Sequence, residues 1–383
     1  MNLFAFDAEQ ARAEASDFLV RMSAARARMQ QASQAQIGAT PKQLVYREGK
    51  LALYRYGGHR QKTAGAKSPG AKRQPPGGKR QPPGGKSKPA LAALAPPLLI
   101  VYALVNRPYM MDLQEDRSLI RGLLAQGVDV YLIDWGYPDR GDRFVGLADY
   151  ILGYLDRCIA HICAERGVAA VDLLGVCQGG TFSLCYTALR PKRVRRLVTM
   201  VTPVDFQTPD NLLSKWARTL DVDLIVETFG NVPGEVLNAA FLALMPFRLM
   251  HQKYVDLADL AADPRALENF MRMEKWIFDS PDQAGAAFRE FVGAFYQRNA
   301  LVTGTLAIAG ERVRMRALRQ PILNVYGLRD HLVPPGASRA LDGLTGSRDY
   351  QELAFDTGHI GMYVSGRTQR ELPARIGEWL RGR

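Results

Sequence analysis

A cysteine occupies the position of a catalytic nucleophile in the stretch GVCQGG, residues 175–180. The spacing is that of G-x-S-x-G, the sharp strand-to-helix turn on which serine hydrolases expose their nucleophile, with cysteine in place of serine. Small neighbours permit the strained backbone and the close strand–helix packing of such a turn. The next helix would point its N-terminus at Cys177 and favour a thiolate. We therefore expect Cys177 to be a nucleophile; the alternative is a buried cysteine at an ordinary strand–helix turn.

An acid and a histidine follow the cysteine in the chain order nucleophile, acid, base that α/β-hydrolases use. Asp330 comes shortly after the apolar stretch PILNVYG, and His359 comes just after YQELAF. These residue types predict that His359 acts as general base and that Asp330 orients it. Asp134 and Asp205 also follow expected strands and are the rival acids, but Asp330 lies in the late loop where the fold places its acid.

Three further positions could assist the reaction. Two backbone N–H groups are needed to hold a developing oxyanion. We expect them at Gln178 and at Val105 or its immediate neighbour, in the loop ALVNRPYMMDLQ. His331, the neighbour of Asp330, is expected to serve the local loop structure or to line the substrate pocket rather than to act as the base.

The elements that must position these residues alternate from residue 96 onward. Near-continuous apolar strands separated by helices predict a mostly parallel sheet covered on both faces. Together with the nucleophile turn, this pattern predicts an α/β-hydrolase fold with an inserted, mainly helical cap. The expected strands are 97–103, 128–135, 169–176, 195–201, 321–327 and 350–355, and the expected helices are 116–126, 146–166, 180–190, 336–344 and 367–381.

The chain divides into five expected segments. The first two differ from the core in composition: an N-terminal helix and hairpin, and a disordered loop that repeats KRQPPGG. The others are the two halves of the α/β-hydrolase core and, between them, a stretch rich in Leu, Met, Phe and Trp that is expected to be the cap. In chain order they are 1–56, 57–90, 91–203, 204–315 (the cap) and 316–383.

Charge and cysteine content limit the compartment and the partners. The net charge is +12, but nine Lys and Arg and no acid lie between Arg60 and Lys88, so a nucleic-acid partner is not expected. Cys158, Cys163 and Cys185 fit core positions and a reducing compartment. No apolar stretch approaches the ~18–20 residues that cross a bilayer, and the N-terminus lacks a secretory signal. We therefore expect a soluble, cytoplasmic protein.

These residues resemble the catalytic subunit of polyhydroxyalkanoate synthases, specifically the two-subunit class III. The resemblance implies that Cys177 carries the acyl group, that His359 is its general base, and that Asp330 orients the histidine and helps to activate the incoming hydroxyl. The matching stretches are VYALVNRPYMMDLQEDRS, VYLIDWGYPD, LLGVCQGG, LVTMVTPVDF, EKWIFDSPDQAG, YGLRDHLVPP and GHIGMYVSG.

The resemblance also implies a reaction and partners. The reaction would be polymerisation of short-chain (R)-3-hydroxyacyl-CoA, with release of CoA and without a metal or redox cofactor. A second, non-catalytic subunit, a homodimer or higher oligomer, and association with polyester granules are implied as well. The alternatives are a cysteine-dependent hydrolase or thioesterase on the same fold, and an inert granule-coat or nucleic-acid-binding protein led by the basic loop.

Overall fold

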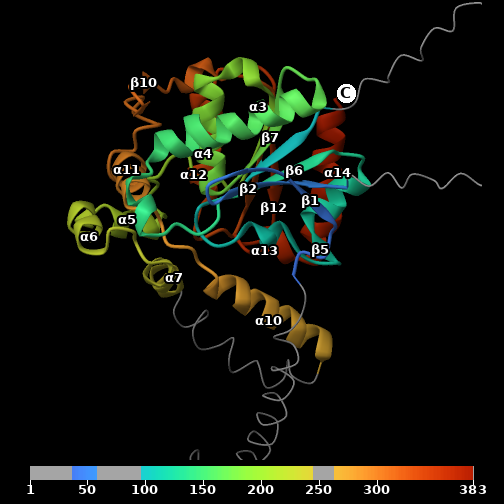
Figure 1. Cartoon of the computed structure of the whole chain (residues 1–383), viewed down its shortest axis with the longest axis horizontal. Coiled ribbons are helices and arrows are strands. Elements are labelled where there is room, and N and C mark those ends of the chain that lie inside the picture. The colour runs from blue at the N-terminus through green and yellow to red at the C-terminus, as the bar shows by residue number, and fades with distance from the viewer. Residues whose placement is uncertain (1–36, 58–95, 245–262, 383) are drawn as a thin grey trace, which may run out of the picture.

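The computed structural model describes residues 37–57, 96–244 and 263–382. A twisted sheet with helices on both faces forms its centre, and further helices from the middle of the chain lie to one side (Figure 1). The predicted N-terminal helix, nearly all of the predicted basic loop and residues 245–262 of the predicted cap lie outside the described residues. In the part that is described, none of the helices is long and apolar enough to cross a membrane.

The sheet has eight strands in the order β1-β2-β6-β3-β7-β8-β11-β12. All six predicted core strands are confirmed, and they run parallel to one another. The predicted hairpin is also present, and it extends the sheet by pairing antiparallel with β6, an arrangement that the sequence did not predict. The bounds are β1 Lys42–Glu48, β2 Leu51–Tyr56, β3 Leu98–Val101, β6 Val130–Asp134, β7 Val171–Val176, β8 Val194–Met200, β11 Ile322–Gly327 and β12 Tyr350–Phe355.

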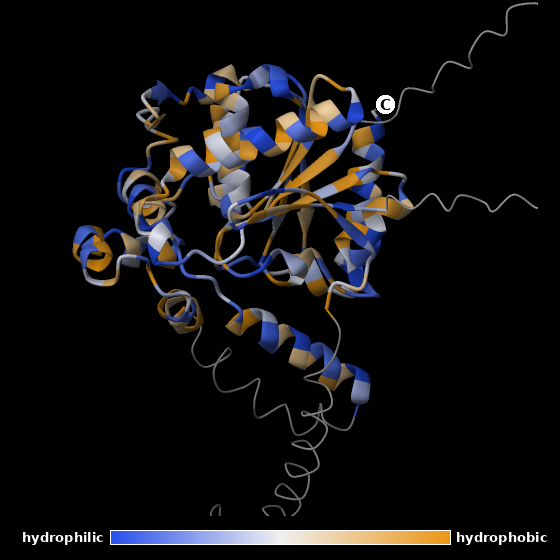
Figure 2. Ribbon diagram, in the orientation of Figure 1, coloured by the Kyte–Doolittle hydropathy of each residue, from blue (hydrophilic) through white to orange (hydrophobic). Residues whose placement is uncertain are grey.

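Buried side chains on both faces explain why the core strands are apolar throughout. In β3, Leu98 and Ile100 face one hydrophobic cluster, while Leu99 and Val101 face the other. Such alternation is inherent in a strand, and here both faces are covered by helices. Strands coloured as hydrophobic therefore run through the middle of the molecule in Figure 2.

Two pairs of helices cover these faces. α3 Leu155–Arg166 and α4 Gln178–Leu189 pack on one, and α2 Leu119–Ala125 and α14 Gly366–Arg381 on the other. Helix α12 Pro335–Leu344 adds Leu341 to the first cluster. Cys158, Cys163 and Cys185 lie in this core, as predicted.

The stretch between β8 and β11 is mostly helical, as expected for the cap. Its described helices are α5 Leu212–Ala217, α6 Val222–Phe229, α7 Gly234–Ala243, α10 Pro264–Phe278 and α11 Gly285–Phe291, which continues as a π-helical turn over Val292–Gln297. α11 and this turn join the cap to the core, since Ala287, Phe291 and Phe295 belong to the main hydrophobic cluster.

Short elements complete the loops around the sheet. A 3₁₀ turn over Pro108–Met111 follows β3, and α13 Gly361–Val364 follows the last strand. The remaining short strands are β4 Asp112–Gln114, β5 Arg117–Ser118, β9 Ala307–Ile308 and β10 Glu311–Arg312.

Candidate active site

Cys177 sits on a strained turn between β7 and α4. Its φ of 52° and ψ of −123° lie in a region that residues with a side chain rarely adopt. The backbone N–H of Cys177 donates to the carbonyl of Met200 at 2.9 Å, which fixes the turn to β8. A Cβ at Gly179 would overlap the carbonyl oxygen of Val101, and a Cβ at Gly180 would overlap the side chain of Thr202. Only glycine therefore lets the first turn of α4 approach β3 this closely.

Asp330 and His359 form a buried pair at the same edge of the sheet. The Nδ1 of His359 lies 2.7 Å from the Oδ2 of Asp330, and both residues are buried. The other carboxylate oxygen of Asp330 accepts the backbone N–H groups of Leu332 and Val333 at 2.9 Å each. The loop after β11 therefore fixes the acid, and the acid fixes the ring of the histidine.

The charge of His359 follows from its neighbours. Burial disfavours the imidazolium, but the Asp330 carboxylate and a hydrogen bond with Cys177 outweigh that effect and raise the pKa of His359 to about 10. The histidine is thus hydrogen-bonded to an acid, and its charge is also stabilised by the nearby cysteine. A cysteine, a histidine and an orienting acid in this arrangement can perform nucleophilic acyl transfer.

The two rival acids lie elsewhere. Asp134 forms an ion pair with Arg107 at 2.7 Å. Asp205 accepts the side-chain amide of Asn299 at 2.8 Å and the backbone N–H of Gln207 at 2.9 Å. Among the described residues, Asp330 is the one of these three acids that contacts His359.

The loop after β3 lies beside the N-terminus of α4, where the oxyanion donors are expected. The side chain of Gln178 accepts the backbone N–H of Leu104 at 3.0 Å, so that N–H is already engaged. Gln178 is the first residue of α4, and its own N–H has no partner within the helix. Gln178 and Val105 therefore remain the proposed donors, and Leu104 is eliminated, which leaves Asn106 as the neighbour that could replace Val105.

The same loop is held by the end of α10, a connection that the sequence did not predict. Asn106, with a positive φ of 57°, donates its side-chain amide to Ser280 Oγ at 2.8 Å and to the carbonyls of Trp276 and Ile277. The indole N–H of Trp276 donates to the carbonyl of Arg107 at 2.9 Å. We call these contacts the Asn106 clamp. Polar residues in this loop weakly indicated that it makes side-chain hydrogen bonds. Their partners could not be predicted, because they lie some 170 residues away in sequence.

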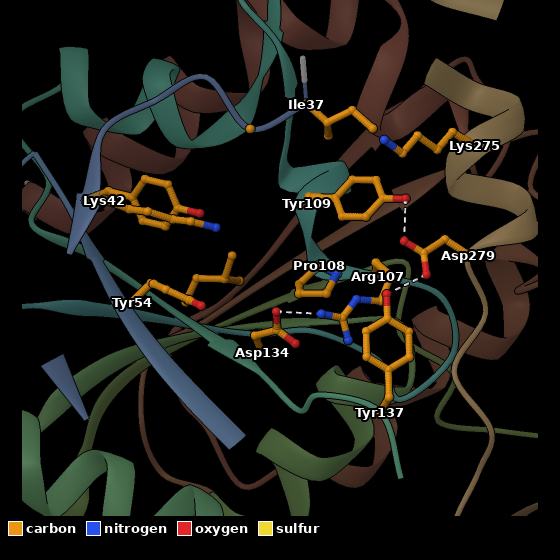
Figure 3. A pocket seen from close by; sticks show the side chains of 13 residues that line it. Ile37, Lys42, Tyr54, Arg107, Pro108, Tyr109, Asp134, Tyr137, Lys275 and Asp279 are labelled. Carbon is orange, nitrogen blue, oxygen red and sulfur yellow. Dashed lines mark hydrogen bonds and ion pairs between the residues drawn. The ribbon is translucent and has the colours of Figure 1, made fainter. Parts of the chain in front are cut away.

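A second set of contacts extends the connection outward. The hydroxyls of Tyr109 and Tyr137 donate to the two carboxylate oxygens of Asp279, at 2.9 and 2.6 Å (Figure 3). Burial, with the Asp279 carboxylate, raises the pKa of Tyr109 well above its usual value. His331 is half-buried in the loop between β11 and α12, beside Asp330, and its role at the substrate pocket stays a prediction.

Comparisons with known proteins identify the family to which the chain belongs. The family model described as alpha/beta hydrolase fold matches residues 96–365. The chain is 56% identical to the poly(3-hydroxyalkanoate) polymerase subunit PhaC of Allochromatium vinosum, over 90% of both chains. It is 52% identical to the subunit of the same name from Thiocystis violacea, over 90% of this chain and 89% of that one, and 49% identical to that of Synechocystis, over 90% and 85%. The chain therefore belongs to the family of poly(3-hydroxyalkanoate) polymerase subunits, acyltransferases built on the α/β-hydrolase fold.

Proposed function

We propose that this chain polymerises short-chain (R)-3-hydroxyacyl-CoA, most simply 3-hydroxybutyryl-CoA, into a polyester through an acyl thioester on Cys177. The observation that carries the proposal is the buried, hydrogen-bonded Asp330–His359 pair whose histidine is influenced by Cys177, a cysteine on a strained turn. Membership of the polymerase family supports the substrate class.

The first half-reaction loads the enzyme. The Cys177 sulfur attacks the thioester carbonyl, the bond between carbonyl carbon and CoA sulfur breaks, and CoA leaves as a thiol with the proton that His359 holds. The N–H groups of Gln178 and Val105 would stabilise the oxyanion that forms in between. One thioester replaces another, so the acyl group keeps its reactivity.

The second half-reaction extends the chain. His359, oriented by Asp330, takes the proton of a 3-hydroxyl group, and the resulting oxygen attacks an acyl thioester. The C–S bond breaks, an oxoester forms, and the proton passes to the cysteine sulfur. Because an oxoester is more stable than a thioester, each transfer to a hydroxyl group is favourable and the polymer grows. A cap that excludes water would prevent hydrolysis of the thioester.

CoA release tests the residue assignments. Replacing Cys177 or His359 by Ala should abolish CoA release from 3-hydroxybutyryl-CoA, and Cys177→Ser should lower it strongly because the acyl group would enter an oxoester. Cys163→Ala, a cysteine of the core on α3, is the matched control. CoA release by Cys177→Ala at the wild-type rate would overturn the proposal.

The product separates the main alternative. A thioesterase with the same active site would release free 3-hydroxybutyrate, whereas the polymerase yields insoluble polyester. Free acid as the sole product of the wild-type enzyme would favour the thioesterase.

We further propose that the chain works in the cytoplasm at granules, as an oligomer with a second, non-catalytic subunit. Exposed apolar side chains on the cap support a protein partner there, because monomers rarely leave such groups uncovered together. Leu224 and Phe229 on α6 and Val236 on α7 are 59%, 50% and 48% exposed. Co-purification and measured mass, for the wild type and Leu224→Ser/Phe229→Ser, test this: equal partner binding by both would exclude this surface.

A further inference from the structure

A pocket of about 330 Å³ lies outside the catalytic residues and has no role in the steps above (Figure 3). Its walls come from the start of the described chain, the hairpin, the loop after β3, the end of β6 and the end of α10. Tyrosines supply much of the lining. Figure 3 shows the amines of Lys42 and Lys275 on opposite sides of it, the first from β1 and the second from α10.

The charged residues that line this pocket are Lys42, Arg107 and Lys275 together with Asp134 and Asp279, so it carries a net positive charge that favours an anion. Arg107 is neutralised by Asp134, and Asp279 already accepts two tyrosine hydroxyls. Lys42 and Lys275 are exposed, and neither forms an ion pair with a carboxylate in the described part of the chain. The Nζ of Lys42 lies 4.2 Å from the centre of the Tyr54 ring, so a cation and an aromatic face are presented together.

The pocket reaches the edge of the sheet that carries the catalytic residues through Asp134, Arg107 and Tyr109, whereas Lys42 and Tyr56 line it from the amino edge, because Lys42 pairs with Tyr56 and Tyr56 with Val130. Asp134 ends β6, and Arg107 and Tyr109 follow β3, whereas Cys177 follows β7. β6, β3 and β7 are neighbours in that order, so β6 and β7 are about 10 Å apart. β3 is also the point at which the strand order reverses, and such crevices at the carboxyl ends of strands are where α/β proteins bind ligands.

We propose that this pocket binds the phosphate-bearing nucleotide end of the CoA thioester, with Lys42 and Lys275 contacting its phosphates and the tyrosine rings facing its base. The inference rests on the proposed function, which supplies the substrate. The pantetheine arm has the length of about four extended residues, on the order of 14 Å, and would run toward Cys177 from the side of the pocket that the loop after β3 forms. The loop after β3 lines the pocket and also carries the proposed oxyanion donor Val105. Binding of the nucleotide would therefore help to position the backbone N–H that contacts the reacting carbonyl.

Two substrates separate this role from a general loss of activity. One is 3-hydroxybutyryl-CoA; the other is the 3-hydroxybutyryl thioester of N-acetylcysteamine, which lacks the nucleotide. For Lys42→Gln/Lys275→Gln, the ratio of kcat/KM between the two substrates should fall about tenfold, through KM for the CoA substrate, since contacts to charged groups contribute that much. Lys42→Arg/Lys275→Arg should restore the ratio. Lys192→Gln, an exposed lysine before β8 at the other edge of the sheet, is the control.

A binding measurement covers the case in which turnover fails. Adenosine 3′,5′-bisphosphate should bind the wild type in calorimetry and bind the double glutamine variant about tenfold more weakly, while inorganic phosphate alone should compete poorly. A wild type that releases no CoA but binds the bisphosphate in a lysine-dependent way would contradict the proposed function and keep this site. An unchanged substrate ratio together with lysine-independent binding would overturn the site itself.

Discussion

His359 couples the charge of the active site to the stability of the fold. Its pKa is about 10 in the folded chain, because the effects of Asp330 and Cys177 exceed that of burial, and about 6.5 in an unfolded one. The folded chain therefore binds one proton more between these values, and the resulting stabilisation is complete below pH 6.5 and lost as pH rises through 10.

We predict that the urea midpoint of the wild type falls between pH 6.5 and pH 10 by more than that of His359→Gln. The difference between the two chains isolates this histidine from other groups that titrate at high pH. Parallel midpoints across that range would contradict the coupling.

Iodoacetamide should also alkylate Cys177 more slowly in His359→Gln at pH 7, since the neighbouring imidazolium is gone.

The glycines of the nucleophile turn support a second prediction at this scale. Gly179→Ala places a methyl group against the backbone of β3, and overpacking of this kind costs about 1–3 kcal/mol in the free energy of unfolding. Gly343→Ala is the matched control, because that glycine lies in α12 with open space around its Cβ position and should gain about 0.5–1 kcal/mol. Urea titration measures both free energies of unfolding. An unchanged free energy of unfolding in Gly179→Ala would show that β3 can move to make room for the methyl group.

Sequence reasoning identified Cys177, Asp330 and His359 as one site because the fold prescribes their order along the chain. The structure brings the acid and the histidine to 2.7 Å, and Cys177 is near enough to contribute to the raised pKa of His359. The oxyanion donors are harder to predict, since every residue but proline has a backbone N–H and only the path of the loop selects among them.

Between elements, the Asn106 clamp connects α10 to the loop after β3, which carries the proposed oxyanion donor Val105. Its amide contacts the carbonyls of Trp276 and Ile277 in α10 and the Oγ of Ser280 just after that helix, and these contacts hold a backbone with positive φ next to Val105. Asn106→Ala should lower kcat for CoA release about 10–100-fold with a smaller effect on KM, because small displacements of a positioning group have effects of that size. Gln320→Ala removes an exposed amide contact to Pro191 and is the control.

A folded Asn106→Ala chain with the wild-type kcat would show that the loop keeps its shape without α10. Asn106→Asp keeps the size but not the donor, so it should behave like the alanine variant. The urea midpoints of all three chains would separate a change in position from a loss of fold.

The bounds of the core strands and helices were predicted from the local sequence pattern to within a few residues. Long buried runs of Val, Ile and Leu leave little choice of structure. The pairing of the hairpin with β6 and the contact of α10 with the loop after β3 were not predicted. Both join segments distant in the chain, and no periodicity in either partner encodes the other.

At the scale of the whole molecule, the basic segment is attached far from the chemistry. Tyr56, at the end of β2, and Leu98, at the start of β3, both pair with Val130, the first residue of β6. The segment therefore leaves and rejoins the sheet about 10 Å apart at its amino edge, whereas Cys177 lies at the carboxyl edge.

Deleting residues 60–88 should consequently leave CoA release within about twofold of the wild type. Twelve residues would remain between Tyr56 and Leu98, and at about 3.3 Å per residue they easily cover the gap. A chain in which Gly and Ser replace the segment at equal length separates charge from length. A tenfold loss of CoA release in the deletion alone would show that length matters to the fold, and a loss in both would give the basic residues a part in turnover.

The strand order also sets when the enzyme becomes active during its own synthesis. β7, the cysteine turn and β8 are complete by Met200, so the nucleophile can take its strained shape early. Asp330 and His359 arrive only after the cap has been made and β11 and then β12 have been added beyond β8, one after the other. A nascent chain therefore carries the proposed nucleophile without its proposed base until β12 and the loop after it have been made, so activity should appear late in synthesis.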